Sequence, residues 1–132
     1  MATPREQQAL NMQYTHALIT IATVNFDSLV NFYTQVLEQK PKNLISSVYA
    51  EFEISSLSLG IFKPHKNSES EFATNAKSPL SLCLEVSNLE NAITHLQSLG
   101  YSPPGEISTA SHGREIYAYD PDGNRLILHQ SH

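Results

Sequence analysis

The chain has 132 residues, a length that fits one domain with a sizeable core, and its formal net charge is −5. Because it has no cluster of Lys and Arg, we expect neither nucleic acid nor a membrane surface as a partner. Its single cysteine, Cys83, excludes an intrachain disulfide and a multi-cysteine metal site. No apolar run is long enough to span a membrane and no signal-peptide core is visible, so the sequence predicts a cytoplasmic protein.

The first half of the chain predicts a strand followed by a helix. Residues 1–14 are expected to form an N-terminal tail, with a strand near 16–24 and a helix near 26–39 that ends before Pro41. Asn25 is placed to accept hydrogen bonds from the free amides of the first helical turn. Apolar residues then recur at helical spacing, which predicts one buried face: Phe26, Leu29, Val30, Tyr33 and Val36.

Three short strand patterns follow: "LISSV", "YAEFEI" and "LSLGIF". The last two are separated only by Ser55 and Ser56, which predicts a tight hairpin. Residues 64–79 are polar, with a proline near each end, and predict a linker.

The second half repeats the first without a gap, at an offset of 63 residues (88 − 25). It predicts a strand near 81–87 and a helix near 89–99, with Asn88 as the N-terminal cap and Gly100 as the left-handed C-terminal cap. The strands "REIYAY" and "RLILHQ" then flank the turn "DPDG". In that turn Asp120 can accept from backbone amides ahead of it, Pro121 presets the backbone dihedral angle and Gly123 can take a positive φ.

The repeat predicts an α+β domain over 15–132, built from two tandem βαβββ modules. Module one covers about 15–63 and module two about 80–130. We expect the strands to form a curved, incompletely closed mixed β-sheet with the helices on its outer face.

Two motifs resemble those of the vicinal oxygen chelate superfamily, which includes glyoxalase I, extradiol dioxygenases, and the fosfomycin and bleomycin resistance proteins. They are "VNFDSLVNFYTQVL", which resembles the family's helix entry ending in Phe-Tyr, and "YDPDGNRLIL", which resembles its terminal hairpin. The resemblance covers residues 15–130. It implies a concave sheet that binds small molecules and a homodimer in which modules pair, either within one chain or between two chains. A shared fold does not fix the chemistry.

The resemblance also implies a divalent metal held by a His or Glu on each of four strands. The matching positions here carry three residues without donor atoms and one neutral hydroxyl: Leu18, Gly60, Ile127 and Ser81. A hard cation needs several anionic or imidazole donors, so we expect no metal ligand at these positions and no cofactor. The alternative is a divalent metal in a shifted site that uses His16, Glu85 and His129. The other four histidines receive no role: His65, His95, His112 and His132.

Strand alternation divides the side chains into two faces. One face is apolar and is expected to pack on the helices: Ile19, Ile21, Leu57, Leu59, Ile61, Leu82, Leu84, Val86, Leu126 and Leu128. The other face is mixed and is expected to line a cavity. Its candidate ligand-binding residues are Leu18, Thr20, Phe62, Cys83, Glu85, Tyr117, Arg125 and His129.

Within this mixed face Glu85 is a candidate general base, although a salt bridge between Glu85 and Arg125 explains the two charges equally well. We expect Cys83 to be a small buried filler and not a nucleophile.

These observations favour a small-molecule-binding protein that has lost the usual metal ligands and binds a polar organic ligand. A metal-dependent lyase, isomerase or dioxygenase with the shifted site is the main alternative. An enzyme without metal, with Glu85 as base, and an interaction module without a ligand also remain open.

Overall fold

The computed structural model describes residues 12–73 and 78–132. The N-terminal module contains β1 (Ile19–Ala22), α2 (Phe26–Val36), β2 (Asn43–Ile45), β3 (Tyr49–Ile54) and β4 (Leu57–Phe62). The C-terminal module contains β5 (Ser81–Glu85), α4 (Leu89–Ser98), β6 (Ser108–Ala110), β7 (Gly113–Tyr119) and β8 (Arg125–Ser131). Between them lie a 3₁₀ helix, η1 (Lys66–Ser68), and a short helix, α3 (Glu69–Phe72).

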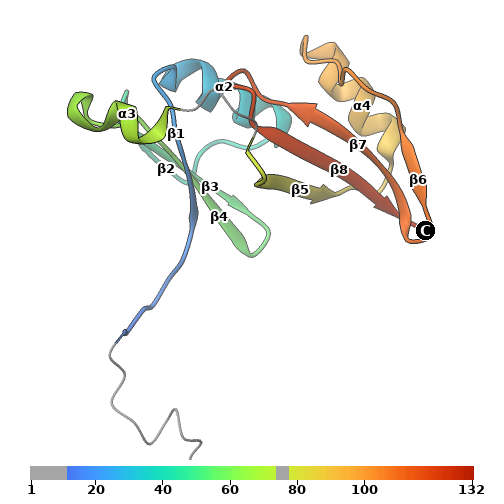
Figure 1. The fold of residues 1–132 in the computed structure, drawn as a ribbon, viewed down its shortest axis with the longest axis horizontal. Coiled ribbons are helices and arrows are strands. Elements are labelled where there is room, and N and C mark those ends of the chain that lie inside the picture. The colour runs from blue at the N-terminus through green and yellow to red at the C-terminus, as the bar shows by residue number, and fades with distance from the viewer. Residues whose placement is uncertain (1–11, 74–77) are drawn as a thin grey trace, which may run out of the picture.

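Each module is a βαβββ unit with its own four-stranded sheet (Figure 1). The strand orders are β1-β4-β3-β2 and β5-β8-β7-β6. In both sheets the first strand pairs in parallel with the last, and the other pairs are antiparallel. The expected α+β fold of two repeated modules is therefore confirmed, with the eight strands divided between two open mixed sheets.

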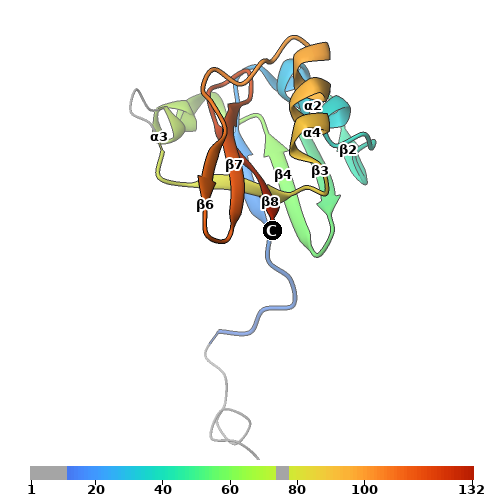
Figure 2. The same ribbon diagram turned by 90° about the vertical axis from the view of Figure 1, so that its right-hand side faces the viewer.

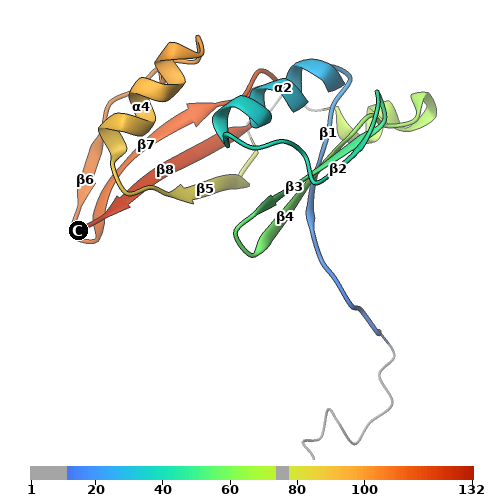
Figure 3. The same cartoon turned by 180° about the vertical axis from the view of Figure 1, so that it is seen from behind.

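Helices α2 and α4 lie on one side of the strands, as the front and back views show (Figures 1 and 3). The stretch before β1 instead leads away from both sheets (Figure 2). The strand β1 begins at Ile19 and α2 ends at Val36, so both are shorter than the sequence predicts. The expected linker contains η1 and α3, and Phe72 of α3 packs edge to face on Phe62 with ring centroids 5.3 Å apart.

The two helices begin differently, although each start has the same pattern of an Asn, an apolar residue and an acidic residue. At α4 the expected cap forms, because Asn88 Oδ1 accepts from the Asn91 amide at 2.8 Å. At α2 the expected cap is wrong: the Asn25 side chain makes no capping bond. The Asn25 backbone amide instead donates to Thr23 Oγ1 at 2.9 Å. The expected left-handed cap at Gly100 is confirmed by its φ of 91°.

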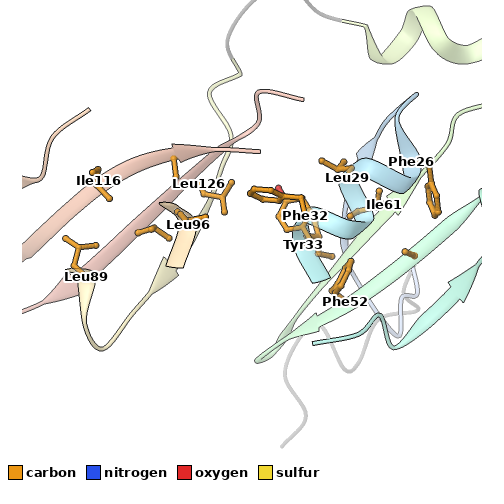
Figure 4. Close-up of a cluster of buried hydrophobic side chains, with 14 residues drawn as sticks. Phe26, Leu29, Phe32, Tyr33, Phe52, Ile61, Leu89, Leu96, Ile116 and Leu126 are labelled. Carbon is orange, nitrogen blue, oxygen red and sulfur yellow. The ribbon is translucent and has the colours of Figure 1, made fainter. Parts of the chain in front are cut away.

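The buried core lies between each helix and the apolar face of its sheet (Figure 4). Leu59, Ile61, Leu126 and Leu128 of the predicted apolar face are buried, and Ile21, Leu82, Leu84 and Val86 pack against this core. Ile19 and Leu57 depart from the prediction, since 51% and 37% of their surfaces are exposed. Both residues begin their strands, where the helix no longer covers them.

The two modules meet at the turn between β7 and β8. Asp120 is 4% exposed, and its Oδ1 accepts from the backbone amides of Asp122 and Asn124, each at 2.9 Å. Gly123 has a φ of 87°, so the predicted turn chemistry is confirmed. Asp120 Oδ2 accepts from Tyr33 Oη of α2 at 2.7 Å, and Thr23 Oγ1 donates to Asp122 Oδ2 at 2.6 Å. The two motifs that carry the family resemblance therefore contact each other.

Candidate ligand-binding face

Nine side chains from three strands form the uncovered surface of the C-terminal sheet, which we call the open face. The register of β5, β8 and β7 arranges them in three rows: Ser81, Arg125 and Tyr119; Cys83, Ile127 and Tyr117; Glu85, His129 and Glu115. Their neighbours along each strand point the other way, into the core. The rows place a cation at one end of the face, a less polar middle, and a cluster of acidic and imidazole groups at the other end.

Arg125 occupies the cationic end, and its partners among the described residues are uncharged. Its Nη1 donates to the Ser78 carbonyl at 3.0 Å and to Ser81 Oγ at 3.1 Å, and its guanidinium carbon lies 6.0 Å from the centre of the Tyr117 ring. The salt bridge to Glu85, the alternative explanation of these two charges, does not form. The register explains this, because Arg125 pairs with Ser81 while Glu85 lies at the far end of the strands.

The middle row is accessible to solvent, and half of the Tyr117 surface is exposed. Cys83 is exposed as well, so the expectation of a buried filler is wrong. The reason is that none of the helices in residues 12–73 and 78–132 covers this side of β5. Partial desolvation, followed by the negative charges of Glu115 and Glu85, raises the pKa of the Cys83 thiol. This environment favours the thiol over the thiolate, in line with the expectation that Cys83 is not an activated nucleophile.

Both carboxylate oxygens of Glu85 are engaged at the acidic end. Oε1 lies 2.7 Å from His129 Nδ1, and Oε2 accepts from the Ser131 backbone amide at 2.7 Å. The hydrogen bond with His129 and then that from Ser131 lower the pKa of Glu85. A carboxylate with a lowered pKa is a weaker base, so these contacts argue against direct proton abstraction by Glu85.

His112 also belongs to this cluster, although no role was expected for it from the sequence. Its Nδ1 lies 3.0 Å from His129 Nε2, and the two rings are stacked with centroids 5.2 Å apart. Gly113 leaves room for the His129 ring in this stacked pair, because an added Cβ would lie 3.0 Å from that ring and against the Gln130 carbonyl. The signal was present in the sequence: antiparallel pairing counted back from the "DPDG" turn sets Gly113 opposite Ser131, beside His129.

The remaining candidates, Leu18, Thr20 and Phe62, belong to the N-terminal sheet or the stretch before it. Around Gly60 this region is filled: an added Cβ would lie 3.0 Å from Tyr49 Oη and 3.2 Å from Leu18 Cδ1. Tyr49 Oη donates to Glu51 Oε1 at 2.6 Å, and desolvation followed by this hydrogen bond raises the pKa of Tyr49 to about 12. A side chain larger than glycine at position 60 would have to displace the Tyr49 hydroxyl.

The residues at the family's metal positions do not fit a divalent cation. Leu18, Gly60 and Ile127 carry no donor atom and Ser81 carries a neutral hydroxyl. The shifted site is not assembled either. Residues 12–73 and 78–132 contain no group of three or more His, Cys, Asp or Glu side chains that could hold a metal ion, so His16 does not join Glu85 and His129.

Two hollows of the chain, of about 440 and 550 Å³, do not lie on the open face. The first lies between α2 and the β2 region and the second beside the Asp122 turn. None of the residues that line them belongs to the open face. No helix in the described part of the chain is long and apolar enough to cross a membrane.

The arrangement of paired βαβββ modules defines the class of protein, and the comparisons agree. Residues 14–128 match the model of the Glyoxalase/Bleomycin resistance protein/Dioxygenase superfamily, and the chain belongs to this superfamily. A search of the curated proteins finds no match.

Solved structures share the fold at low sequence identity. A glyoxalase/bleomycin resistance protein/dioxygenase family enzyme from Burkholderia phytofirmans PsJN has a TM-score of 0.74 and 14% identity, over 87% of this chain and 97% of that chain. A glyoxalase-related enzyme from Fulvimarina pelagi has a TM-score of 0.69 and 16% identity, over 90% and 89%. The fosfomycin resistance protein FosX from Listeria monocytogenes, solved with Mn(II) and sulfate, has a TM-score of 0.68 and 18% identity, over 92% and 93%.

Proposed function

We propose that this protein binds a small organic anion with an aromatic or apolar body on the open face, without a divalent metal at the family's position. The observation that carries this proposal is Arg125. Its guanidinium group is fixed by two neutral oxygens and forms no ion pair within residues 12–73 and 78–132. A fixed cation that is not neutralised is suited to a carboxylate or phosphate group.

The neighbouring row accounts for the rest of the ligand. Tyr117 and Ile127 provide an aromatic ring and an aliphatic surface directly beside Arg125. Aromatic and apolar walls with few polar groups are typical of small-molecule sites. The chemistry at Leu18, Gly60, Ser81 and Ile127 supports binding without Lewis-acid assistance, since this donor set offers a cation only one neutral hydroxyl.

We also propose that the protein is cytoplasmic and that it forms a homodimer. The dimer is supported because β1 and β5 lie at the free edges of their sheets and Leu18 and Ile19 are exposed before and within β1. Pairing of one module with a module of a second copy would cover these edges and enclose the open face. The exposed apolar surface is the support for this part of the proposal.

Titration with phenyl phosphate, monitored by calorimetry, tests the binding proposal, with benzyl alcohol as the uncharged control. We expect saturable binding of phenyl phosphate, none of benzyl alcohol at the same concentrations, and at least a tenfold weaker affinity for Arg125→Met, which keeps an unbranched apolar stem and removes the charge. Equal binding of phenyl phosphate by wild type and Arg125→Met would contradict it.

A further inference from the structure

The acidic end of the open face contains a chain of three groups joined by hydrogen bonds: Glu85, His129 and His112, which we call the relay. Glu85 Oε1 is 2.7 Å from His129 Nδ1, and His129 Nε2 is 3.0 Å from His112 Nδ1. A carboxylate can only accept, so His129 Nδ1 carries a proton. With neutral rings, His129 Nε2 then accepts from His112 Nδ1–H, and the lone pair of the relay lies on His112 Nε2.

The relay is held in place from several sides. The Ser131 amide donates to Glu85 and fixes its carboxylate. The absence of a side chain at Gly113 leaves room for the His129 ring. His112 itself lies in the two-residue turn between β6 and β7, where its ring stacks on His129. His112 Nε2 has no hydrogen-bond partner among the described residues.

From this geometry we infer that the relay is a general base, with His112 Nε2 as the atom that takes a proton from a ligand on the open face. When His112 Nε2 accepts a proton, the proton on His112 Nδ1 can pass to His129 Nε2. The positive charge then lies on His129, directly beside the Glu85 carboxylate, which stabilises it. The proton acceptor is thus an imidazole, and Glu85 positions His129 and neutralises its charge.

The inference deepens the proposed function, since the ligand would lie on the same face. Arg125 and His129 are four residues apart on β8, a separation of roughly 13 Å along a strand. The proton acceptor, His112, contacts His129 and not Arg125. The ligand class is therefore an extended anion whose charged group lies near Arg125 and whose acidic C–H or O–H group lies near the far end of the open face. Other titratable groups next to the relay are Glu115, in register with His129, Cys83, and His132, whose Nε2 lies 3.0 Å from the Ala110 carbonyl.

A Kemp elimination with 5-nitrobenzisoxazole tests the relay with a neutral probe that needs no cofactor. The base takes the proton from C3, the C–H electron pair forms the nitrile, the ring N–O bond breaks, and the phenolate product is followed by its absorbance. We expect turnover above that of an equal concentration of free imidazole, and a loss of roughly tenfold or more in His112→Ala. His65→Ala, a histidine distant from the relay, is the matched control and should retain the wild-type rate.

The pH profile separates a relay from a single exposed histidine. The wild-type rate should rise with pH as the relay loses its proton. In Glu85→Gln the Ser131 contact can be kept, but the negative charge is lost, so the imidazolium is less stable and the midpoint should move to lower pH. Unchanged midpoints in Glu85→Gln and His129→Ala, or turnover that survives His112→Ala, would overturn the inference.

The two proposals fail in different experiments. Phenyl phosphate binding without histidine-dependent elimination would support the anion site and contradict the general-base role of the relay. Histidine-dependent elimination without phenyl phosphate binding would support the general-base role of the relay and contradict the proposed ligand class.

Discussion

Tyr33→Phe should weaken the junction between the two modules by removing one hydrogen bond and no packing. The Tyr33 ring is fully buried, and its hydroxyl donates to Asp120 Oδ2 at 2.7 Å. A hydrogen bond to a charged group contributes about 1.5–3 kcal/mol. Asp120 keeps three donors, two backbone amides and Asn124 Nδ2, so the carboxylate is not left without partners. We therefore expect a loss near 2 kcal/mol in the free energy of unfolding.

Urea unfolding at one fixed protein concentration measures this loss, and thermal unfolding should show a decrease of roughly 8 °C in Tm for a domain of this size. Tyr101→Phe is the matched control. Tyr101 packs on Phe32 at the same junction, with ring centroids 4.8 Å apart, and its hydroxyl has no hydrogen bond among the described residues. Its change should stay within about 0.5 kcal/mol. Equal losses in Tyr33→Phe and Tyr101→Phe would refute the reasoning.

Three further predictions concern the C-terminal module and the assembly. Gly113→Ala should lower the free energy of unfolding by about 1–3 kcal/mol, since the new Cβ meets the His129 ring and the Gln130 carbonyl; a stability equal to wild type in urea would contradict this. The hydrogen bond from Arg114 lowers the pKa of Glu90 to about 2, so its stabilising contribution is complete above the ordinary pKa near 4.5 and disappears as the pH falls toward 2. Wild type should therefore lose its advantage over Glu90→Gln between these pH values, whereas a constant difference in Tm would count against the pair. Light scattering at micromolar concentration should give the mass of a dimer, and a mass near 14.7 kDa would exclude it.

Much of the fold could be predicted because the sequence pattern of one βαβββ module is repeated in the second half of the chain. The helical spacing of apolar residues, the "DPDG" turn and the cap at Gly100 are local signals, and all of them are confirmed. Asn25 shows the limit of local reasoning. Its motif matches that of Asn88, but its backbone amide donates to the neighbouring Thr23 hydroxyl. That hydroxyl also donates to Asp122 of the other module.

The candidate site could be predicted only in part. Alternation placed Cys83, Glu85, Tyr117, Arg125 and His129 on one face, as the register shows. It could not choose partners within that face, because alternation gives the side of a sheet and not the position along it. The pairing of Glu85 with His129 depends on the register of β5 against β8, and the contribution of His112 depends on a turn between strands.

The most direct test of the central claim is a map of where a small anion binds to metal-free protein. Elemental analysis of the purified protein, before any chelator is added, would measure its metal content. The ¹⁵N–¹H spectrum would then be recorded after dialysis against a chelator and at each step of a titration with phenyl phosphate. The account predicts no stoichiometric divalent metal before the titration and saturable shifts at the backbone amides of Ser81, Cys83, Tyr117 and Arg125. It would be contradicted by one equivalent of tightly held metal, or by shifts confined to the N-terminal sheet around Gly60.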